Sequence, residues 1–415
     1  MAQLAIAGGQ PVRRTLMPQW PVWGQEEVEA VRSVVESGRW GSLHGTEVRC
    51  FEAEFAAYQE AAYGIAVTNG TVALKLALTA AGVGVGDEVI MPGYTFVATA
   101  TAALEIGAVP VFADINPGTY TLDPASVEAC ITPRTRAIVP VHLGGRPADM
   151  DALMALAQRH DLMVIEDAAQ AWGASWQGRK AGTLGHVAGF SFQSSKNITA
   201  GEGGIILTND PVIGALAQSL SNCGRQPDGL WYAHYVLGGN YRLSEFHGAV
   251  LRVQLRRYPP QLARRQANAA YLERALSEIP GITTLRRDER VTSNAYHVLF
   301  LQYHPEAFGG GSKERFLAAM RAEGIDAMHA GYSLPVYRQP VLLAKNFGLA
   351  TPPLFSGVYP DVPDYSKVAL PATDRACAEE ALWVRQSVLL GERQDMDDIV
   401  AAIGKIQRYS HELQE

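Results

Sequence analysis

A single lysine, Lys196, lies in the segment SFQSSKNITAGEGG (residues 191–204), among small polar residues and glycines. The residues before it alternate between apolar and polar, and residues 205–208 are apolar, which predicts a strand on each side of the segment. Alone, such a lysine is most often a solvated loop charge. The GEGG sequence, however, lets the backbone approach a ligand closely, and Ser191 can donate a hydroxyl to an anion. The alternative is therefore that Lys196 is the reactive amine of an enzyme.

A carboxylate pair precedes this lysine. Glu166 and Asp167 end the apolar part of VIEDAAQAWG (residues 164–173), and Asp167 lies 196 − 167 = 29 residues before Lys196. A carboxylate buried at a strand end requires a partner. An aspartate at such a position most often caps a turn. The functional alternative is a carboxylate that pairs with the protonated ring nitrogen of a bound cofactor.

A third feature, TNGTVALKLAL (residues 68–78), ends a predicted strand and begins a predicted helix, with Gly70 and Thr71 at the turn. Free backbone N–H groups and the positive end of the helix dipole favour an anion such as phosphate there. An ordinary helix start would need only the Thr or the Asn as its cap. The nearby GVGVGD (residues 82–87) follows a helix and precedes a strand, the wrong context for a dinucleotide-binding loop.

Together these features indicate one cofactor. Pyridoxal phosphate needs a lysine for its Schiff base, a carboxylate at its ring nitrogen and a cradle for its phosphate. The chain offers one group for each need: Lys196 for the Schiff base, Asp167 for the ring nitrogen and the TNGT turn for the phosphate.

The elements that position these groups follow an alternating pattern. From about residue 64 to residue 168, apolar segments typical of strands alternate with helical segments. This pattern predicts a mostly parallel α/β sheet with helices on both faces. Such sheets bind ligands at the carboxyl ends of their strands, where Gly70, Asp167 and Ser191 are expected to lie.

The rest of the chain predicts a second, smaller unit. A long amphipathic helix is expected from residue 244 to about residue 279, followed by one strand over residues 289–305 and a helix over residues 313–324. A length of 415 residues exceeds what one hydrophobic core usually covers. We expect a large domain of residues 1–260, which includes the N-terminal segment, and a small α+β domain of residues 261–415.

Composition excludes several function classes. The net charge is 35 − 42 = −7, with no sustained basic block, which argues against nucleic acid or an anionic membrane as a partner. No apolar run approaches the roughly 18 residues of a membrane span, and the N-terminus is not that of a signal peptide. The four cysteines are far apart and form no CxxC pair, so neither a metal centre nor a disulfide framework is expected. A cytoplasmic location is the expectation.

Five motifs occur along the chain in the order TNGT, PGYTF, EDAAQA, SFQSSKNITAGEGG and GGNYRLSE. In this order they resemble the DegT/DnrJ/EryC1/StrS family of sugar and cyclitol aminotransferases. The likeness extends from LAIAGGQPVRR near the N-terminus to LPATDRACAEE near the C-terminus. The resemblance implies a fold-type I, pyridoxal-phosphate-dependent transferase, built as a homodimer with active sites at the subunit interface.

The resemblance also assigns roles around the cofactor ring. It implies that Lys196 forms the internal aldimine and moves the proton, and that Asp167 pairs with the pyridine nitrogen. Phe96, in PGYTF, would stack on the ring, and Gln170 would hydrogen-bond near the phenolic oxygen. Two alternatives stay open, because aromatic residues at strand ends are usually core and Gln170 can simply be a polar residue at a helix start.

The phosphate would be held by residues from two subunits. Gly70, Thr71 and Ser191 would bind it from one chain, and the resemblance implies that Asn240, in GGNYRLSE, reaches it from the neighbouring subunit. An ordinary turn residue is the alternative for Asn240.

The implied reaction transfers an amino group from L-glutamine or L-glutamate to a ketone on a cyclitol or a nucleotide-linked sugar, in two half-reactions. WPVWG and SGRWGSLHG resemble the branch that aminates scyllo-inosose or its 2-deoxy analogue, in which L-glutamine is the usual donor. Relatives that dehydrate sugars have histidine at the lysine position, so Lys196 favours amino transfer. Relatives that make 3-amino-5-hydroxybenzoate retain the lysine. That chemistry stays open, as does a regulatory protein that binds the cofactor without turnover.

Three more side chains are candidates for contact with the substrate. His142 ends a predicted strand in VPVHLGG, at a point where family members often have a bulkier residue in place of Gly144 or Gly145. His329 and Tyr332, in MHAGYSLPVY, would reach the site from the small domain. A structural role is an equal alternative for each of the three.

Overall fold

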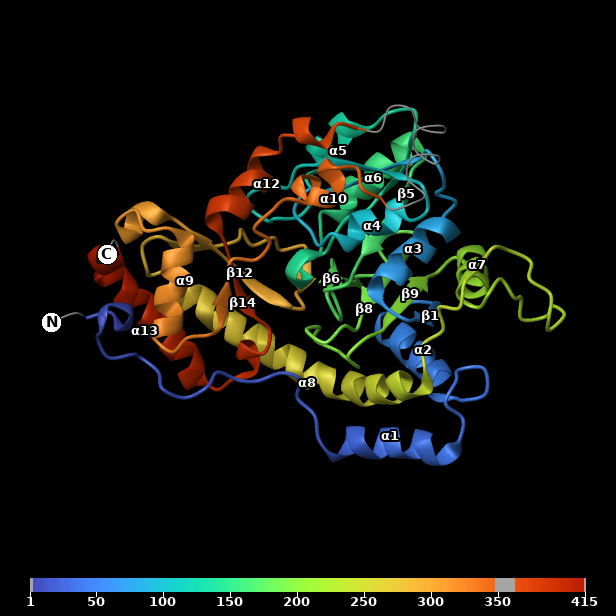
Figure 1. Ribbon diagram of the computed structural model, residues 1–415, viewed down its shortest axis with the longest axis horizontal. Coiled ribbons are helices and arrows are strands. Elements are labelled where there is room, and N and C mark those ends of the chain that lie inside the picture. Colours follow the sequence, from blue (N-terminus) through green and yellow to red (C-terminus); the bar gives the residue numbers. More distant parts are fainter. Residues whose placement is uncertain (1–2, 348–362, 414–415) are drawn as a thin grey trace.

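The computed structural model describes residues 3–347 and 363–413, and Figure 1 shows their arrangement. A seven-stranded sheet with the order β1-β9-β8-β5-β4-β2-β3 forms the centre of the larger part. Strand β9 is antiparallel to both of its neighbours, and the other six strands run in one direction. The prediction of a mostly parallel sheet is confirmed. The strands are β1 (Tyr63–Val67), β2 (Glu88–Pro92), β3 (Val109–Ala113), β4 (Thr135–Ile138), β5 (Met163–Asp167), β8 (Val187–Ser191) and β9 (Gly204–Thr208).

Helices cover both faces of this sheet, as the apolar strands predict. Helices α3 (Gly70–Ala80), α4 (Ala98–Leu104) and α7 (Pro211–Ser221) pack on one face. Helices α2 (Glu47–Tyr58), α5 (Pro124–Cys130) and α6 (Met150–His160) pack on the other face. Alternation along β2 serves both layers, because Val89 and Met91 belong to the first core and Ile90 to the second.

Side-chain caps begin several of these helices at the sheet edge. The Oδ1 of Asn69 accepts a hydrogen bond of 2.9 Å from the backbone N–H of Val72 and so starts α3 directly after β1. Aspartates cap α5, α6 and α7 in the same way. Such caps satisfy backbone donors that a helix start leaves free, and they fix the short turns between strand and helix.

The smaller part contains a four-stranded antiparallel sheet in the order β10-β12-β14-β13. Helices α9 (Lys313–Ala322) and α13 (Arg393–Arg408) pack with this sheet in one core, and both chain ends lie beside them in Figure 1. The strands are β10 (Ile282–Thr284), β12 (Val298–Tyr303), β13 (Met328–His329) and β14 (Ala381–Arg385). Short helices α10 (Pro340–Leu343) and α12 (Pro371–Arg375) lie over the larger part.

The prediction of one strand over residues 289–305 is wrong. Strand β11 (Val291–Ser293) joins a separate three-stranded sheet with β6 (Ser175–Trp176) and β7 (Arg179–Lys180), whereas β12 belongs to the small-part sheet. Between them Tyr296 adopts a positive φ of 45°. The backbone N–H groups of Ala295 and His297 donate to the carbonyls of Gly145 and Gly144. These contacts turn the chain from one sheet to the other.

Helix α8 (Glu245–Leu276) connects the two parts and confirms the long helix that the sequence predicts. Figure 1 shows it running beneath both parts, with α1 (Gln25–Ser37) packed along its outer side. Residue 260 lies within this continuous helix, so a division into domains at that position stays a prediction. Among the described residues, no helix combines the length and the apolar character needed to cross a membrane.

The aromatic cluster between α2 and the sheet provides a stability test. The fully buried ring of Phe55 lies edge-on to Phe190 and Phe192, at 5.3 and 5.2 Å between ring centroids. We expect Phe55→Ala to lower the free energy of unfolding by about 3–5 kcal/mol, because it leaves a cavity in a packed core. The control Val212→Ala removes methyl groups from a side chain that is 74% exposed, and we expect a change within about 0.5 kcal/mol. Urea unfolding followed by far-UV circular dichroism measures both; equal losses would contradict the assignment of this core.

Candidate active site

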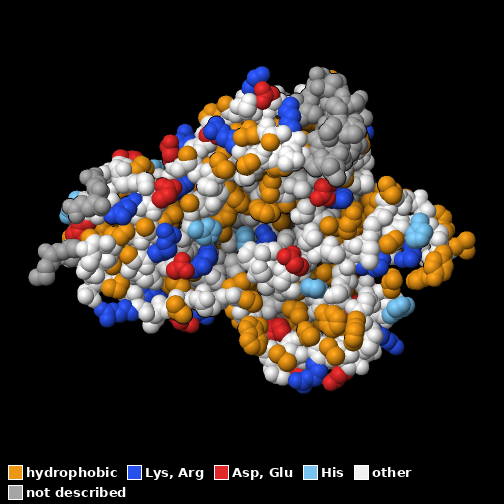
Figure 2. Space-filling model, viewed as in Figure 1, with side chains coloured by type: hydrophobic (Ala, Val, Ile, Leu, Met, Phe, Trp, Pro, Cys, Tyr) orange, Lys and Arg blue, Asp and Glu red, His pale blue; other side chains and the backbone are white. Residues whose placement is uncertain are grey.

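The carboxyl ends of the parallel strands bring the predicted groups to one edge of the sheet. Asp167 is the last residue of β5 and Ser191 the last residue of β8. Gly70 begins α3 after β1, and Thr99 lies in α4 after β2. Near the middle of the face seen in Figure 2 the surface is hollowed, and basic side chains lie inside the hollow.

Asp167 is a buried carboxylate with few partners. Its Oδ2 accepts a 2.7 Å hydrogen bond from the hydroxyl of Thr99, and its Oδ1 accepts a longer one, 3.3 Å, from the backbone N–H of Ala169. Burial raises the pKa of Asp167 above its ordinary value, although these hydrogen bonds and the charge of Lys196 oppose the rise. A cation placed beside this carboxylate would therefore be stabilised.

Lys196 faces the same carboxylate. Burial of its amine lowers the pKa of Lys196 to about 8, and the negative charge of Asp167 partly opposes this shift. An ordinary lysine has a pKa near 10.5, so far more of the nucleophilic neutral amine is present here at neutral pH. The structure brings the two residues together, as the sequence predicts from their types alone.

Contacts from distant segments hold the backbone on either side of Lys196. The indole Nε1 of Trp20 donates to the carbonyl of Ser194 at 2.9 Å, and Nε2 of Gln386 donates to the carbonyl of Ser195 at 3.4 Å. After the lysine, Nδ2 of Asn197 donates to the carbonyl of Ala295 at 2.8 Å. The sequence reasoning missed these residues, although Trp20 lies in the WPVWG segment.

The predicted phosphate turn is tightly packed. A Cβ on Gly70 would lie 2.7 Å from the Cβ of Ser191, and a Cβ on Gly204 would lie 2.4 Å from the backbone oxygen of Asn69. Only glycine fits at these two positions. Thr71 follows in the first turn of α3 and is partly buried. The start of α3 and the end of β8 therefore pack directly against each other at this edge of the sheet.

Asn240 precedes Tyr241, whose carbonyl accepts a 3.0 Å hydrogen bond from the backbone N–H of Thr68 in this turn. It is exposed, and its backbone forms an isolated bridge with Asn222 beyond the end of α7. Within one chain the structure does not bring its side chain into the predicted set.

Phe96 follows β2 and is 59% exposed, so the alternative that it is a core residue is wrong. Its ring lies 6.5 Å from the ring of Tyr332. Tyr332 in turn contacts Trp383 of β14 at 4.7 Å and Tyr94 at 5.6 Å between ring centroids. These aromatic rings form a wall beside Asp167.

Tyr332 and Gln170 also belong to the site. Gln170 acts on Tyr332 and opposes the rise of its pKa, and the Oε1 of Gln170 accepts a 2.6 Å hydrogen bond from the backbone N–H of Gly144. The pKa of Tyr332 is raised, first by burial and then by the negative charge of Asp167. Tyr332 therefore reaches from the smaller part to within the electrostatic range of Asp167.

His142 has partners within the protein at both ring nitrogens. It is fully buried; Nδ1 accepts from the backbone N–H of Ala148 at 3.1 Å, and Nε2 lies 2.7 Å from Oε2 of Glu166. Of the two roles left open for His142, this geometry favours the structural one. The carboxylate of Glu166 also accepts three backbone hydrogen bonds, from Gly182, Leu184 and Gly185.

The glycines beside His142 explain why a bulkier residue is absent here. Gly144 and Gly145 both have positive φ, at 67° and 90°. A Cβ on Gly144 would lie 2.4 Å from the ring of Phe300, and one on Gly145 would lie 2.6 Å from the Cβ of Ala295. A larger side chain at either position would push the small-part sheet away.

His329 lies at the rim of the aromatic wall. Its ring is exposed on one side and packs 5.4 Å from Trp383. The structure places it near His297, whose pKa it helps to lower.

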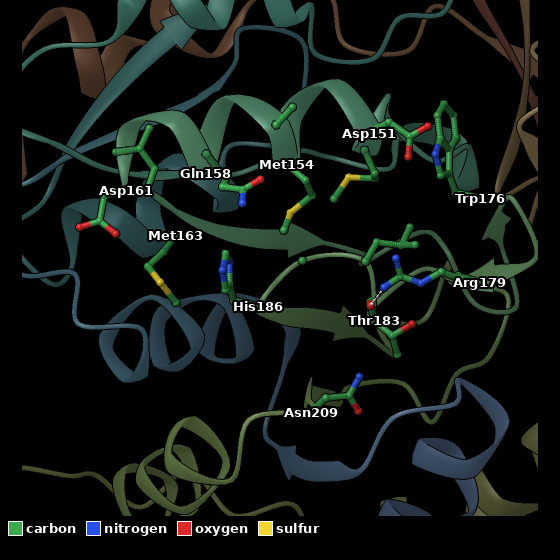
Figure 3. A pocket seen from close by; sticks show the side chains of 16 residues that line it. Asp151, Met154, Gln158, Asp161, Met163, Trp176, Arg179, Thr183, His186 and Asn209 are labelled. Carbon is green, nitrogen blue, oxygen red and sulfur yellow. Dashed lines mark hydrogen bonds between the residues drawn. The ribbon is translucent and has the colours of Figure 1, made fainter.

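A cavity lies at the opposite edge of the sheet. It has a volume of about 850 Å³ and is lined by α6 and by the amino ends of β5 and β8. Figure 3 shows Met163, His186 and Arg179 around it. The Nδ1 of His186 accepts from the backbone N–H of Val164, and Arg179 donates to the carbonyl of Thr183. These polar groups already have protein partners, so the cavity offers no reactive constellation.

Comparison with known proteins adds to this geometry. The family model described as the DegT/DnrJ/EryC1/StrS aminotransferase family matches residues 21–353. This chain belongs to that family.

The aminotransferase is similar to several characterised or solved relatives. It is 38% identical to the L-glutamine:2-deoxy-scyllo-inosose aminotransferase of Micromonospora echinospora, over 100% of both chains. The crystal structure of 3-amino-5-hydroxybenzoic acid synthase matches it with a TM-score of 0.85 and 35% identity, over 96% of this chain and 99% of the other. DesV of S. venezuelae matches with a TM-score of 0.80 and 34% identity, over 93% and 94%. These matches confirm the predicted family and the fold-type I architecture.

The lowered pKa of Lys196 leads to a test on the aminotransferase without cofactor. Because only the neutral amine reacts, acetylation of Lys196 by acetic anhydride should rise with pH to half its maximum near pH 8. In Asp167→Asn the midpoint should move to lower pH, since the carboxylate's attraction for the ammonium is lost. Mass spectrometry of the peptide that contains Lys196 measures the rate. Asp151→Asn, at the opposite edge of the sheet, serves as the control. A midpoint near pH 10.5 in the unmodified protein would contradict the burial of the amine.

Proposed function

We propose that this aminotransferase uses pyridoxal phosphate to transfer the amino group of L-glutamine or L-glutamate to a ketone carbon of a cyclitol or sugar. The observation that carries the proposal is the pairing of Lys196, whose pKa burial lowers to about 8, with the buried carboxylate of Asp167. The full-length similarity to the M. echinospora enzyme supports the choice of donor and acceptor.

The residues present fit the cofactor. Asp167 is a buried carboxylate whose pKa is raised by burial, and a protonated pyridine nitrogen beside it would stabilise its charged form. Gly70, Thr71 and Ser191 would hold the phosphate, where only glycine fits at the strand edge. Phe96 would cover the ring, and Gln170 would hydrogen-bond near its phenolic oxygen.

When bound, pyridoxal phosphate supplies an electron-withdrawing ring that stabilises negative charge on the carbon losing its proton. Asp167 favours the protonated form of the ring nitrogen, since an opposite charge at close range stabilises a cation. Thr99 fixes the orientation of that carboxylate through its 2.7 Å hydrogen bond. Lys196 would hold the cofactor through Nζ, and the same atom, as a free amine, would accept the α-proton of the amino donor. A base placed in this way accelerates proton transfer by about 10²–10⁴-fold.

The substrate would lie against the exposed ring of Phe96 and the partly exposed ring of Tyr332, with the buried rings of Tyr94 and Trp383 packed behind them. Aromatic faces suit the apolar C–H face of a polyhydroxylated ring, and the hydroxyl of Tyr332 gives one polar contact. His329, at the rim, would meet the part of the substrate that points outward. We place His142 outside this set, because its ring nitrogens have protein partners.

A second candidate has specific support. The TM-score of 0.85 to 3-amino-5-hydroxybenzoic acid synthase favours related chemistry on a precursor of an aromatic amino acid. The mass of the product distinguishes the two reactions. A regulatory protein without turnover is the weaker reading, since a sensor has no need of both Lys196 and Asp167.

A second copy of this chain would complete the site. The segment between α7 and α8 carries exposed hydrophobic side chains, at fractions between 55% and 99%, and Figure 2 shows them gathered at the right-hand tip of the molecule. A patch of this kind marks a protein–protein interface. Asn240 lies at the end of this segment and would reach the partner's phosphate site. The residues of the patch are Leu230, Trp231, Tyr232 and Leu237.

A spectroscopic experiment tests the reaction. The purified protein with cofactor should show the visible band of the lysine-bound form and lose it on addition of L-glutamine or L-glutamate. Addition of a keto-cyclitol or keto-sugar should restore the band, with product mass as the readout. Lys196→Ala should lose both changes, and Lys367→Ala, whose side chain is 82% exposed, should lose neither. A band that persists with every amino donor would refute the proposed function.

Mixing of two inactive variants tests the shared site. Lys196→Ala and Asn240→Ala should each be strongly impaired. A hybrid dimer contains one site with both native residues, because Lys196 and Asn240 of one site come from different subunits. After unfolding and refolding together in equal amounts, activity should recover to about a quarter of the native value. No recovery, with a dimer present by light scattering, would exclude the placement of Asn240 in the neighbouring site.

A further inference from the structure

Arg265 of α8 is a fully buried cation without a carboxylate partner. Its side chain has no exposed surface, and none of the ion pairs between described residues includes it. Its Nε and Nη2 both donate to Oε1 of Gln386, at 3.1 and 2.6 Å. Within residues 3–347 and 363–413, the third nitrogen, Nη1, has no hydrogen-bond partner.

Burial of an unpaired charge is costly. The rings of Trp20 and Tyr258 lie 5.4 and 5.8 Å from the guanidinium and offset part of this cost as cation–π partners. Burial lowers the pKa of Arg265 to about 10, so the group still carries its charge at neutral pH. Arg265 thus retains a positive charge that no carboxylate among the described residues neutralises.

This charge lies behind the Lys196 segment. Gln386 bonds both to Arg265 and to the carbonyl of Ser195, and Trp20 lies over Arg265 while it donates to the carbonyl of Ser194. Arg265 is therefore linked, through Gln386 and Trp20, to the backbone just before Lys196 on the side of the site toward the smaller part.

The charged groups that act on Lys196 and His297 are basic apart from Asp167, and the exposed carboxylate of Asp326 acts on His329. His297 is buried, and its pKa is held well below the usual range by burial and by the positive charges of Lys196, Arg265 and His329. Asp167 is the acidic group acting on Lys196, and the proposed function pairs it with the cofactor ring. The proposed phosphate site lies at the start of α3, among other residues. The charge of Arg265 is therefore paired neither with Asp167 nor with the proposed phosphate.

We propose that Arg265 provides the positive charge of a subsite for the α-carboxylate of the amino donor. This inference rests on the proposed function and deepens it. L-Glutamine and L-glutamate both carry this carboxylate next to the reacting amine, whereas a free cyclitol carries no anion. Arg265 acts as a positioning residue: it attracts the carboxylate to the His297 and His329 side of Lys196 and so orients the donor's α-carbon toward Nζ.

A pair of matched ligands isolates the carboxylate. 2-Methyl-L-glutamine has no α-proton and so reports binding alone; 4-amino-4-methylpentanamide has a methyl group in place of the carboxylate and likewise has no hydrogen on the amine-bearing carbon. Titration of the holoenzyme with each, followed through the visible spectrum, gives two dissociation constants and their ratio. The wild-type protein should bind the carboxylate-bearing ligand at least about tenfold more tightly, as expected for opposite charges in a partly desolvated site.

Variants of Arg265 then test the source of this preference. Arg265→Gln and the bulkier Arg265→Met should weaken binding of 2-methyl-L-glutamine by about tenfold or more and leave binding of 4-amino-4-methylpentanamide nearly unchanged, whereas Arg265→Lys should retain the preference. Arg264→Gln, one residue earlier with a side chain that is 44% exposed, is the matched control and should behave as wild type.

The outcomes separate the two proposals. Equal weakening of both ligands in Arg265→Gln would show a purely structural role and overturn the inference, and so would a wild-type preference below about threefold, which needs no variant. If neither ligand nor any amino donor changes the wild-type spectrum, the proposed function itself fails. Binding of both ligands without a charge-dependent preference refutes the subsite alone.

Discussion

The electrostatic attraction between the carboxylate of Asp167 and the amine of Lys196 is the interaction on which the site depends. Burial alone would favour the neutral form of both residues, and each partly restores the other's charge across the carboxyl edge of the sheet. This balance keeps a carboxylate ready for a cation and an amine ready to lose its proton. Neither property survives if one partner is moved into water, so the surrounding elements serve first to keep both groups enclosed.

Two layers of support maintain that enclosure. On the β5 side, Glu166 accepts three backbone hydrogen bonds and contacts His142, which fixes the strand end that carries Asp167. On the other side, Trp20 and Gln386 hold the carbonyls just before Lys196. The first layer is local to the large sheet. The second comes from the N-terminal segment and the smaller part, so the position of the lysine depends on the assembly of the whole chain.

The sequence was informative where one local pattern determines one structure. Short apolar runs predict the strands, and the rule that ligands bind at carboxyl ends selects Gly70, Asp167 and Ser191 correctly as neighbours. Contacts that no local pattern encodes were not predicted. Trp20 donates a hydrogen bond to Ser194, 174 residues later in the sequence, and Gln386 donates one to Ser195, 191 residues earlier. Such pairs follow from the packing of complete elements. For the same reason, nothing in the run over residues 289–305 reveals that Tyr296 turns the chain between two sheets.

The two prolines inside α8 have a mechanical consequence. Pro259 and Pro260 lack the N–H groups that would bond to the carbonyls one turn earlier, so the helix is least stiff there. Tyr258 and Arg265 stand on opposite sides of this weak point, and α8 spans both parts of the molecule. Any bending strain in the helix therefore concentrates at these two exposed prolines, between the turn that carries Tyr258 and the turn that carries Arg265.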